Sequence, residues 1–279
     1  MLWNCRGRTV EIAGRPLVMG IVNVTPDSFS DGGNWFDPAK AVEHALTLVE
    51  EGADILDVGG ESTRPGADVV PADEELRRVV PVITELAKRT PVLLSIDTSK
   101  PTVARACLEA GAGIVNDVTG LSDPEMARAC AEAKAGVVVM HMQGDPRTMQ
   151  VNPQYHDVVA DESAFFESRL RVLADSGIDP LTVCIDPGIG FGKTREHNLQ
   201  LLGQLGTFGR FGRPVCLGVS RKGFIDRVCG RALADRMPGS LAVACFAAAR
   251  GEAQVLRVHD VGPTRDAVLL LDAIDRYRR

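Results

Sequence analysis

Residues 17–23 read Leu-Val-Met-Gly-Ile-Val-Asn, a short apolar run that ends on a polar side chain. Working outward from this stretch, the same arrangement recurs about eight times, with helix-like segments between the runs. A strand followed by a helix, repeated in this way over 279 residues, predicts an α/β fold that closes into a (β/α)8 TIM barrel. We expect residues 1–279 to form one domain, because barrels of this size are commonly single units.

The polar side chains that follow the apolar runs share one expected position in such a barrel. They are Asn23, Asp97, Asn116, Asp186, Lys222 and Arg257. Because barrel enzymes carry their chemistry at the carboxyl ends of the strands, these side chains are predicted to converge on one cavity. Arg257 and His259 are two residues apart on the last strand, so both are expected to point to the same face.

Composition and charge indicate which partners and which cell compartment to expect. The formal net charge of -6 argues against a nucleic-acid partner, since such binding relies on a basic face. The seven cysteines are scattered, without a Cys-x-x-Cys pair, which predicts reduced core residues and a cytoplasmic location. No run of ~18 apolar residues is present, so no membrane insertion is expected.

Loops rich in glycine and proline follow several strands. Residues 23–36 and 59–67 are long enough to act as lids or binding loops. A third loop ends in Gly192-Lys193-Thr194, which looks like the end of a phosphate-binding loop. That motif requires glycine at the position of Pro187, so a turn that brings backbone close to a ligand is the favoured interpretation.

Each candidate also has a structural interpretation. Asn116 and Asp186 could make Asx-turns, Lys222 could be a solvated surface cation, and His259 could bind only local backbone. Asp97 is free for another role if Ser99 caps the helix that begins near residue 101.

Arg257 is the hardest of these residues to explain structurally. A guanidinium at the inner end of an apolar strand needs a carboxylate, a phosphate or a π-surface as its partner.

The residue types favour recognition and positioning over covalent catalysis. The sequence has no Ser/His/Asp set, His-Glu-x-x-His motif or clustered metal ligands. Two carboxylates and an amide can accept N–H groups of a flat, nitrogen-rich heterocycle, while Lys222 donates to its oxo group and Arg257 stacks on its face. Asn23, Arg257 and His259 suit an anionic leaving group, helped by a hard cation such as Mg2+.

Seven segments closely resemble the bacterial dihydropteroate synthases, in order and over nearly the whole chain. They are Met-Gly-Ile-Val-Asn-Val-Thr-Pro-Asp-Ser-Phe-Ser-Asp-Gly-Gly (19–33), Asp-Val-Gly-Gly-Glu-Ser-Thr-Arg-Pro-Gly-Ala (57–67), Ser-Ile-Asp-Thr-Ser-Lys (95–100), Asn-Asp (116–117), Asp-Pro-Gly-Ile-Gly-Phe-Gly-Lys (186–193), Ser-Arg-Lys (220–222) and Arg-Val-His-Asp (257–260). The first two are long and specific.

The resemblance implies a transferase of folate biosynthesis. Such an enzyme condenses 6-hydroxymethyl-7,8-dihydropterin pyrophosphate with p-aminobenzoate to give 7,8-dihydropteroate and pyrophosphate. It is typically a homodimer, and sulfonamides compete for its p-aminobenzoate pocket.

Matching positions imply a role for each site residue. The pterin would be held by Asp97, Asn116, Asp186, Lys222 and Arg257, of which Asp97, Lys222 and Arg257 are the expected catalytic residues. Asn23 would ligate Mg2+, Arg257 and His259 would bind the pyrophosphate, and Thr63 would also contact the pterin substrate. The p-aminobenzoate pocket would be bordered by Thr63, Arg64, Pro65, Phe191 and Ser220.

Two alternatives stay open at this level. A pterin-binding paralogue could have lost catalysis and act as a binding or regulatory protein, although the intact loop motifs argue against it. A pterin-dependent methyltransferase on the same barrel should lack the loop after Asn23 and the anion-binding cluster.

Overall fold

The computed structural model describes residues 1–25, 37–63 and 66–277. A parallel sheet of eight strands forms the centre of the molecule, in the order β8-β7-β6-β5-β4-β3-β10-β9. The strands are β3 (Leu17–Asn23), β4 (Ile55–Gly59), β5 (Leu93–Asp97), β6 (Ile114–Asp117), β7 (Gly136–Met140), β8 (Val183–Asp186), β9 (Cys216–Leu217) and β10 (Val255–Val258). The sheet closes through a parallel bridge between Ile185 and Val215, which confirms the predicted barrel.

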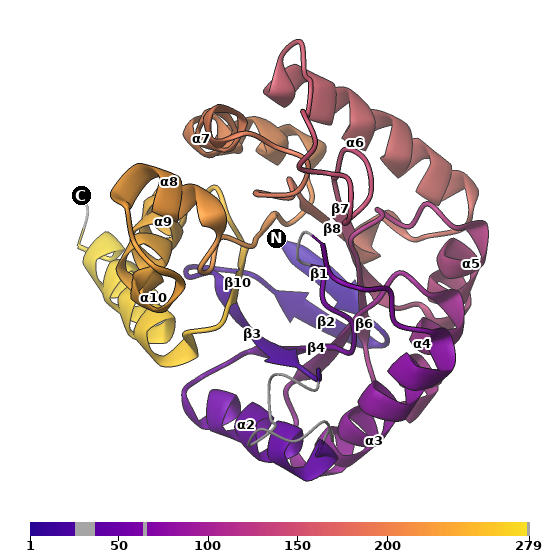
Figure 1. Ribbon diagram of the computed structural model, residues 1–279. Helices are drawn as coiled ribbons and strands as arrows, with labels where there is room; N and C mark the ends of the chain where they lie inside the picture. The colour runs from indigo at the N-terminus through magenta and orange to yellow at the C-terminus, as the bar shows by residue number, and fades with distance from the viewer. Residues whose placement is uncertain (26–36, 64–65, 278–279) are drawn as a thin grey trace.

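Helices surround the sheet and cover its outer face (Figure 1). They are α2 (Pro38–Glu50), α3 (Ala72–Arg89), α4 (Pro101–Ala110), α5 (Pro124–Ala133), α6 (Val158–Asp175), α7 (Arg195–Gly203), α8 (Gly223–Cys229), α9 (Met237–Ala249) and α10 (Val261–Asp275). No described helix combines the length and the apolarity needed to cross a bilayer.

The helix starts show which sequence signals were decisive. Asp37 and Asp123 cap α2 and α5 through their side chains, as the Asp-Pro pairs predict. The expected cap at Ser99 is wrong, because α4 begins after Lys100 without a side-chain cap. The hydroxyl of Thr98 instead accepts the backbone N–H of Lys100 at 3.2 Å.

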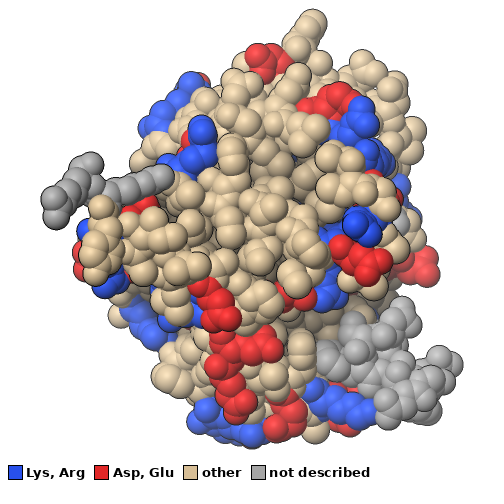
Figure 2. All heavy atoms as spheres, turned by 90° about the vertical axis from the view of Figure 1, so that its left-hand side faces the viewer, with Lys and Arg blue, Asp and Glu red and all other residues tan. Residues whose placement is uncertain are grey.

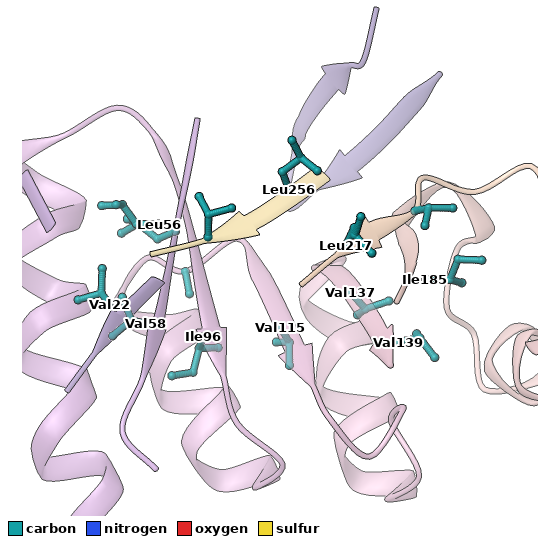
Figure 3. Packing of buried hydrophobic residues seen from close by; sticks show 14 of the residues in the cluster. Val22, Leu56, Val58, Ile96, Val115, Val137, Val139, Ile185, Leu217 and Leu256 are labelled. Carbon is teal, nitrogen blue, oxygen red and sulfur yellow. The ribbon is translucent and has the colours of Figure 1, made fainter. Parts of the chain in front are cut away.

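Side chains along each strand alternate between the outer and the inner face of the barrel, which gives two apolar layers. Outward residues such as Val22, Val58 and Ile96 are buried between the sheet and the helices (Figure 3). Inward residues near the amino ends, among them Met19 and Ile55, form a second buried cluster inside the barrel. The inward positions near the carboxyl ends are polar, so the barrel interior changes from apolar at the amino end to polar at the carboxyl end.

An amino-terminal hairpin closes the amino end of the barrel. β1 (Leu2–Cys5) pairs with β2 (Arg8–Glu11) in antiparallel fashion. Trp3 and Cys5 are fully buried in the inner cluster, and the indole Nε1 donates to the carbonyl of Thr182 at 2.7 Å. The sequence did not predict this hairpin. The hairpin thus occupies the amino end of the barrel. The polar inward side chains lie at the opposite, carboxyl end.

Candidate functional site

Arg257 lies at the centre of the polar carboxyl end. Its Nε lies 2.6 Å from Oδ2 of Asp57, and its Nη2 lies 2.5 Å from Oδ2 of Asp97. Asn116 donates from Nδ2 to the same Asp57 oxygen at 3.0 Å. These four residues come from β10, β4, β5 and β6. Three of the predicted strand-end residues therefore meet in one hydrogen-bonded group.

Asp57 is the member of this group that the sequence analysis missed. It is fully buried in the middle of β4, where its carboxylate binds both Arg257 and Asn116. Its other oxygen, Oδ1, is buried and has no hydrogen-bond partner in the described part of the chain. The available signal was its position two residues before Gly59, which gives it the inward orientation of the site.

Burial and charge set the protonation of this group. Burial raises the pKa of Asp97 to about 7, Arg257 opposes the shift, and Asp57 adds to it. Burial also disfavours the cation of Arg257, but Asp57 and Asp97 outweigh burial and raise the pKa of Arg257 above its usual value. Arg257 thus stays charged, while the pKa of Asp97 lies near neutral pH.

Asp186 and Lys222 form a second group at the same end. A Cβ placed on Gly218 would lie 3.8 Å from Oδ2 of Asp186 and 3.9 Å from Nζ of Lys222, so both side chains reach the same glycine. Lys222 donates to the carbonyl of Ile189, and its Nζ lies 4.3 Å from the ring centroid of Phe191. The lysine predicted as a site residue therefore points inward.

The charges of this second group also depend on burial. Burial lowers the pKa of Lys222 to about 7, although Asp186 favours its cation and Arg257 opposes it. Burial raises the pKa of Asp186, and the positive charges of Lys222 and Arg257 oppose that shift. The charge of Arg257 on β10 thus acts on Asp186 and Lys222, which lie at the same carboxyl end of the barrel.

Lys222→Met is expected to change how stability depends on pH. The pKa of Lys222 is depressed in the folded chain, so above pH 7 the unfolded chain binds a proton that the folded chain does not. Lys222 therefore makes the free energy of unfolding rise with pH between about 7 and the usual lysine pKa. Urea unfolding at pH 6.5 and pH 9 should show wild type gaining stability relative to the variant. An unchanged difference would show that the ammonium is solvated.

Ser220 and His259 make a third contact at the rim. The Ser220 hydroxyl oxygen accepts the backbone N–H of His259 at 3.1 Å and lies 3.0 Å from the ring Nδ1. Arg221 next to it forms a two-pronged pair with Asp260, at 3.1 and 2.5 Å. These contacts tie the end of β9 to the end of β10, where the anion-binding residues were predicted.

The remaining predicted residues are only partly described. Asn23 is half-buried at the end of β3 and is paired in register with Gly59 of β4. Thr63 lies in the described part of the loop after β4. Arg64, Pro65 and most of the loop at residues 23–36 lie outside the described residues, so their expected roles stay predictions.

Lys193 does not have the place of a phosphate-binding lysine. Its side chain is fully buried, with Nζ 3.1 Å from Oε1 of Glu162. His141 Nδ1 lies 3.2 Å from the same oxygen. This agrees with the rejection of a phosphate-binding loop at this turn. The buried cluster of Glu162, His141 and Lys193 was not predicted, because its members come from three separate segments.

Comparison with known proteins agrees with this geometry. The sequence matches the family of pterin binding enzymes over residues 19–259. It is 45% identical over 268 residues to the dihydropteroate synthase of Escherichia coli strain K12, covering 96% of this chain and 94% of that protein.

Solved structures give the same result. A Yersinia pestis dihydropteroate synthase in a sulfonamide drug complex matches with a TM-score of 0.93, 42% identity and 100% of both chains covered. A Xanthomonas albilineans dihydropteroate synthase with 4-aminobenzoic acid matches with a TM-score of 0.92 and 49% identity over 98% of both chains. The resemblance read from the seven segments is thus confirmed. The chain belongs to the family of pterin-binding enzymes that includes the dihydropteroate synthases.

Proposed function

We propose that this chain is a transferase that makes 7,8-dihydropteroate. It condenses 6-hydroxymethyl-7,8-dihydropterin pyrophosphate with p-aminobenzoate and releases pyrophosphate. The observation that carries the proposal is the meeting of Asp97, Asn116, Asp186, Lys222 and Arg257 at one end of the barrel. The similar Xanthomonas albilineans enzyme with 4-aminobenzoic acid supports the choice of the second substrate.

The site has the donors and acceptors that a reduced pterin requires. Asp97 and Asp186 supply carboxylate oxygens for ring and exocyclic N–H groups, and Asn116 supplies an amide. Lys222 supplies a donor for the oxo group. Lys222 donates to the Ile189 carbonyl, so a bound oxo group would replace an existing hydrogen bond of the ammonium.

The charges favour a mechanism in which the C–O bond of the pterin methylene ionises before the aniline nitrogen attacks. Three carboxylates (Asp57, Asp97, Asp186) face two cations (Lys222, Arg257), which leaves one excess negative charge when all are ionised. That excess stabilises the positive charge left on the pterin when pyrophosphate departs. The loops after β3 and β4 would exclude water, which would otherwise trap the cation.

The donor set also fits a magnesium ion bound together with the pyrophosphate. Mg2+ prefers oxygen ligands and is usually held by few protein groups plus substrate phosphates. Asn23, half-buried at the rim, offers a carboxamide oxygen without adding charge. When bound, the ion would neutralise charge on the leaving group. Asn23 would hold it, while Arg257 and His259 bind the pyrophosphate oxygens.

Asn23→Ala is expected to weaken Mg2+-dependent binding of the pterin pyrophosphate about tenfold, the value of one ligand contact. Isothermal titration with Mg2+ and with a chelator measures this effect. The variant should resemble wild type once the metal is removed. Asn4→Ala, in the hairpin at the opposite end, is the matched control. Equal affinities of wild type and Asn23→Ala in Mg2+ would remove Asn23 from the metal site.

Binding and turnover together test the proposed activity. Wild type should bind the pterin pyrophosphate by titration, more tightly with Mg2+, and should release pyrophosphate only when p-aminobenzoate is added. Binding without release would indicate the non-catalytic pterin-binding paralogue. Failure to bind the pyrophosphate ester, with binding of a methylated pterin, would indicate the methyltransferase alternative. A sulfonamide should raise the apparent KM for p-aminobenzoate.

We further propose a homodimer built on the face of α8, α9 and α10. Apolar side chains are exposed there, including Phe246, Leu269, Leu270 and Ile274, with Leu270 63% exposed. Figure 2 shows this side of the molecule, where Lys, Arg, Asp and Glu leave much of the middle uncharged. A second copy would cover these side chains.

A cytoplasmic location is also proposed, supported by seven unpaired cysteines.

Leu270→Glu is expected to convert the dimer to a monomer, because a charge placed in the centre of an apolar contact loses its solvation. Sedimentation velocity at micromolar concentration measures the mass. Val172→Glu is the matched control, since Val172 is 47% exposed on α6, away from this face. A monomeric wild type would refute the proposed dimer, and a dimeric Leu270→Glu variant would refute its placement.

A further inference from the structure

The turn at residues 187–193, here called the glycine turn, contacts the site from one side. Its Gly188 N–H donates to Oδ1 of Asp186 at 2.7 Å. Its Ile189 carbonyl accepts from Lys222. Its Phe191 ring lies under the ammonium of Lys222, 4.3 Å from it. Three side chains assigned to the substrates therefore depend on where this turn lies.

The backbone of the glycine turn is left-handed at three glycines and packs closely against the neighbouring chain. Gly188, Gly190 and Gly192 have φ values of 62°, 86° and 59°, in the left-handed region. A Cβ on Gly188 would collide with the carbonyl oxygen of His141, and one on Gly192 with that of Gln143. The turn is thus pressed against the chain that follows β7. Glycine permits this contact but supplies no side chain to hold it.

Lys193 supplies a fully buried attachment, beside the bonds that Gln150, Tyr155 and Asn198 make to the turn. Its ammonium donates to the carbonyls of Phe191 at 3.0 Å and His141 at 3.3 Å, so it joins the glycine turn to the end of β7. It also lies 3.1 Å from Oε1 of Glu162 on α6, and both side chains are fully buried. A buried ion pair of this kind is weak evidence for stability, because desolvation offsets the attraction. We therefore expect the ion pair to matter for the position of the groups that it holds, and not for stability.

We propose that Glu162 and Lys193 are positioning residues, whose buried ion pair fixes the glycine turn in the place that orients Phe191 and Lys222 for the two substrates. This inference rests on the proposed function, because its test measures that activity. Glu162 sets the direction of the Lys193 ammonium. Lys193 then holds two backbone carbonyls, and the turn between them presents its Ile189 carbonyl and its aromatic ring to Lys222.

A double variant separates this role from a purely structural one. Lys193→Met alone leaves a buried carboxylate without its cation, and so destabilises the chain whatever the pair does. Glu162→Gln with Lys193→Met removes both charges and keeps the side-chain volumes, which should recover much of the melting temperature that Lys193→Met alone loses. The attachment to the two carbonyls is still lost. The positioning role predicts that activity does not return with stability.

The expected result has two parts. In the folded double variant kcat/KM should fall about 100-fold, as for a reacting group misplaced by about 1 Å. KM for the pterin substrate should rise about fivefold to tenfold, the equivalent of one lost hydrogen bond. A crystal structure should show Lys222 away from the Ile189 carbonyl. A structural role would lower kcat only in proportion to the unfolded fraction and leave KM unchanged.

A control variant and the activity of the wild type keep the outcomes distinct. Glu167→Gln with Arg210→Met removes an ion pair of 2.7 Å between α6 and the turn after α7, where both side chains are 49% exposed. It should have wild-type kinetics. An inactive wild type would overturn the proposed function, whereas an active wild type together with a fully active double variant would overturn the positioning role.

A second variant covers the case in which the double variant does not fold. Gln150 donates to the Gly190 carbonyl at 2.8 Å, and the Tyr155 hydroxyl donates to the Gly192 carbonyl at 2.9 Å. Both are half-buried, so Gln150→Ala with Tyr155→Phe should fold. Loosening the same turn should lower kcat/KM about tenfold. Wild-type kinetics in this variant would then overturn the proposal.

Discussion

Asp97→Asn is expected to lower turnover about 100-fold to 1000-fold, the range found when one preorganised electrostatic contact is removed from an active site. In the proposed mechanism this carboxylate would stabilise the carbon that becomes positive when pyrophosphate leaves, and an amide of the same shape would carry no compensating charge. The initial rate of pyrophosphate release measures the loss. Stability should change little, because Arg257 keeps its contact with Asp57 at 2.6 Å.

The matched control is Asp54→Asn at the opposite end of the barrel. Asp54 likewise pairs with an arginine, its two carboxylate oxygens lying 2.7 and 2.8 Å from Arg15. Its removal disturbs an ion pair of the same type without touching the site. Asp54→Asn should therefore keep wild-type turnover. Near-normal dihydropteroate formation by Asp97→Asn would refute the electrostatic role of this carboxylate.

Arg257→Met is expected to affect both stability and activity. It leaves Asp57 fully buried without its cation, and breaking a buried pair in this way costs about 3–5 kcal/mol of the free energy of unfolding. Urea unfolding measures that cost. Turnover should also be lost, because the guanidinium is proposed to bind the pterin and the pyrophosphate.

Adding Asp57→Asn to Arg257→Met separates the two effects. The second change removes the uncompensated charge and should recover part of the lost stability. It should not restore turnover, because the guanidinium is still missing. Recovery of turnover together with stability would mean that Arg257 serves only to neutralise Asp57.

The order of the strands and most of the site were accessible from the sequence. Several apolar runs end on or next to a polar residue, and parallel strands in a closed barrel bring such ends together whatever their separation in the chain. Asp97, Asn116 and Arg257 were found in this way. The rule works because it uses only the local pattern and the direction of the strands.

The features that were missed depend on contacts that no local pattern encodes. Asp57 lies inside an apolar run, where its inward direction follows only from the register of β4. The pairing of Glu162 with Lys193 joins a helix to a distant turn. The hairpin at residues 2–11 is short and mostly polar outside Trp3 and Cys5, and its burial depends on the barrel that it closes.

A crystal structure of the chain with the dihydropterin pyrophosphate and Mg2+ would show where the substrate binds. We expect the pterin ring at the carboxyl ends of the strands, with hydrogen bonds to Asp97, Asn116, Asp186 and Lys222 and with the pyrophosphate beside His259. A pterin bound elsewhere, for example in the cavity of about 370 Å³ between the hairpin and α5 at the amino end, would refute the assignment of the substrate site to the carboxyl end.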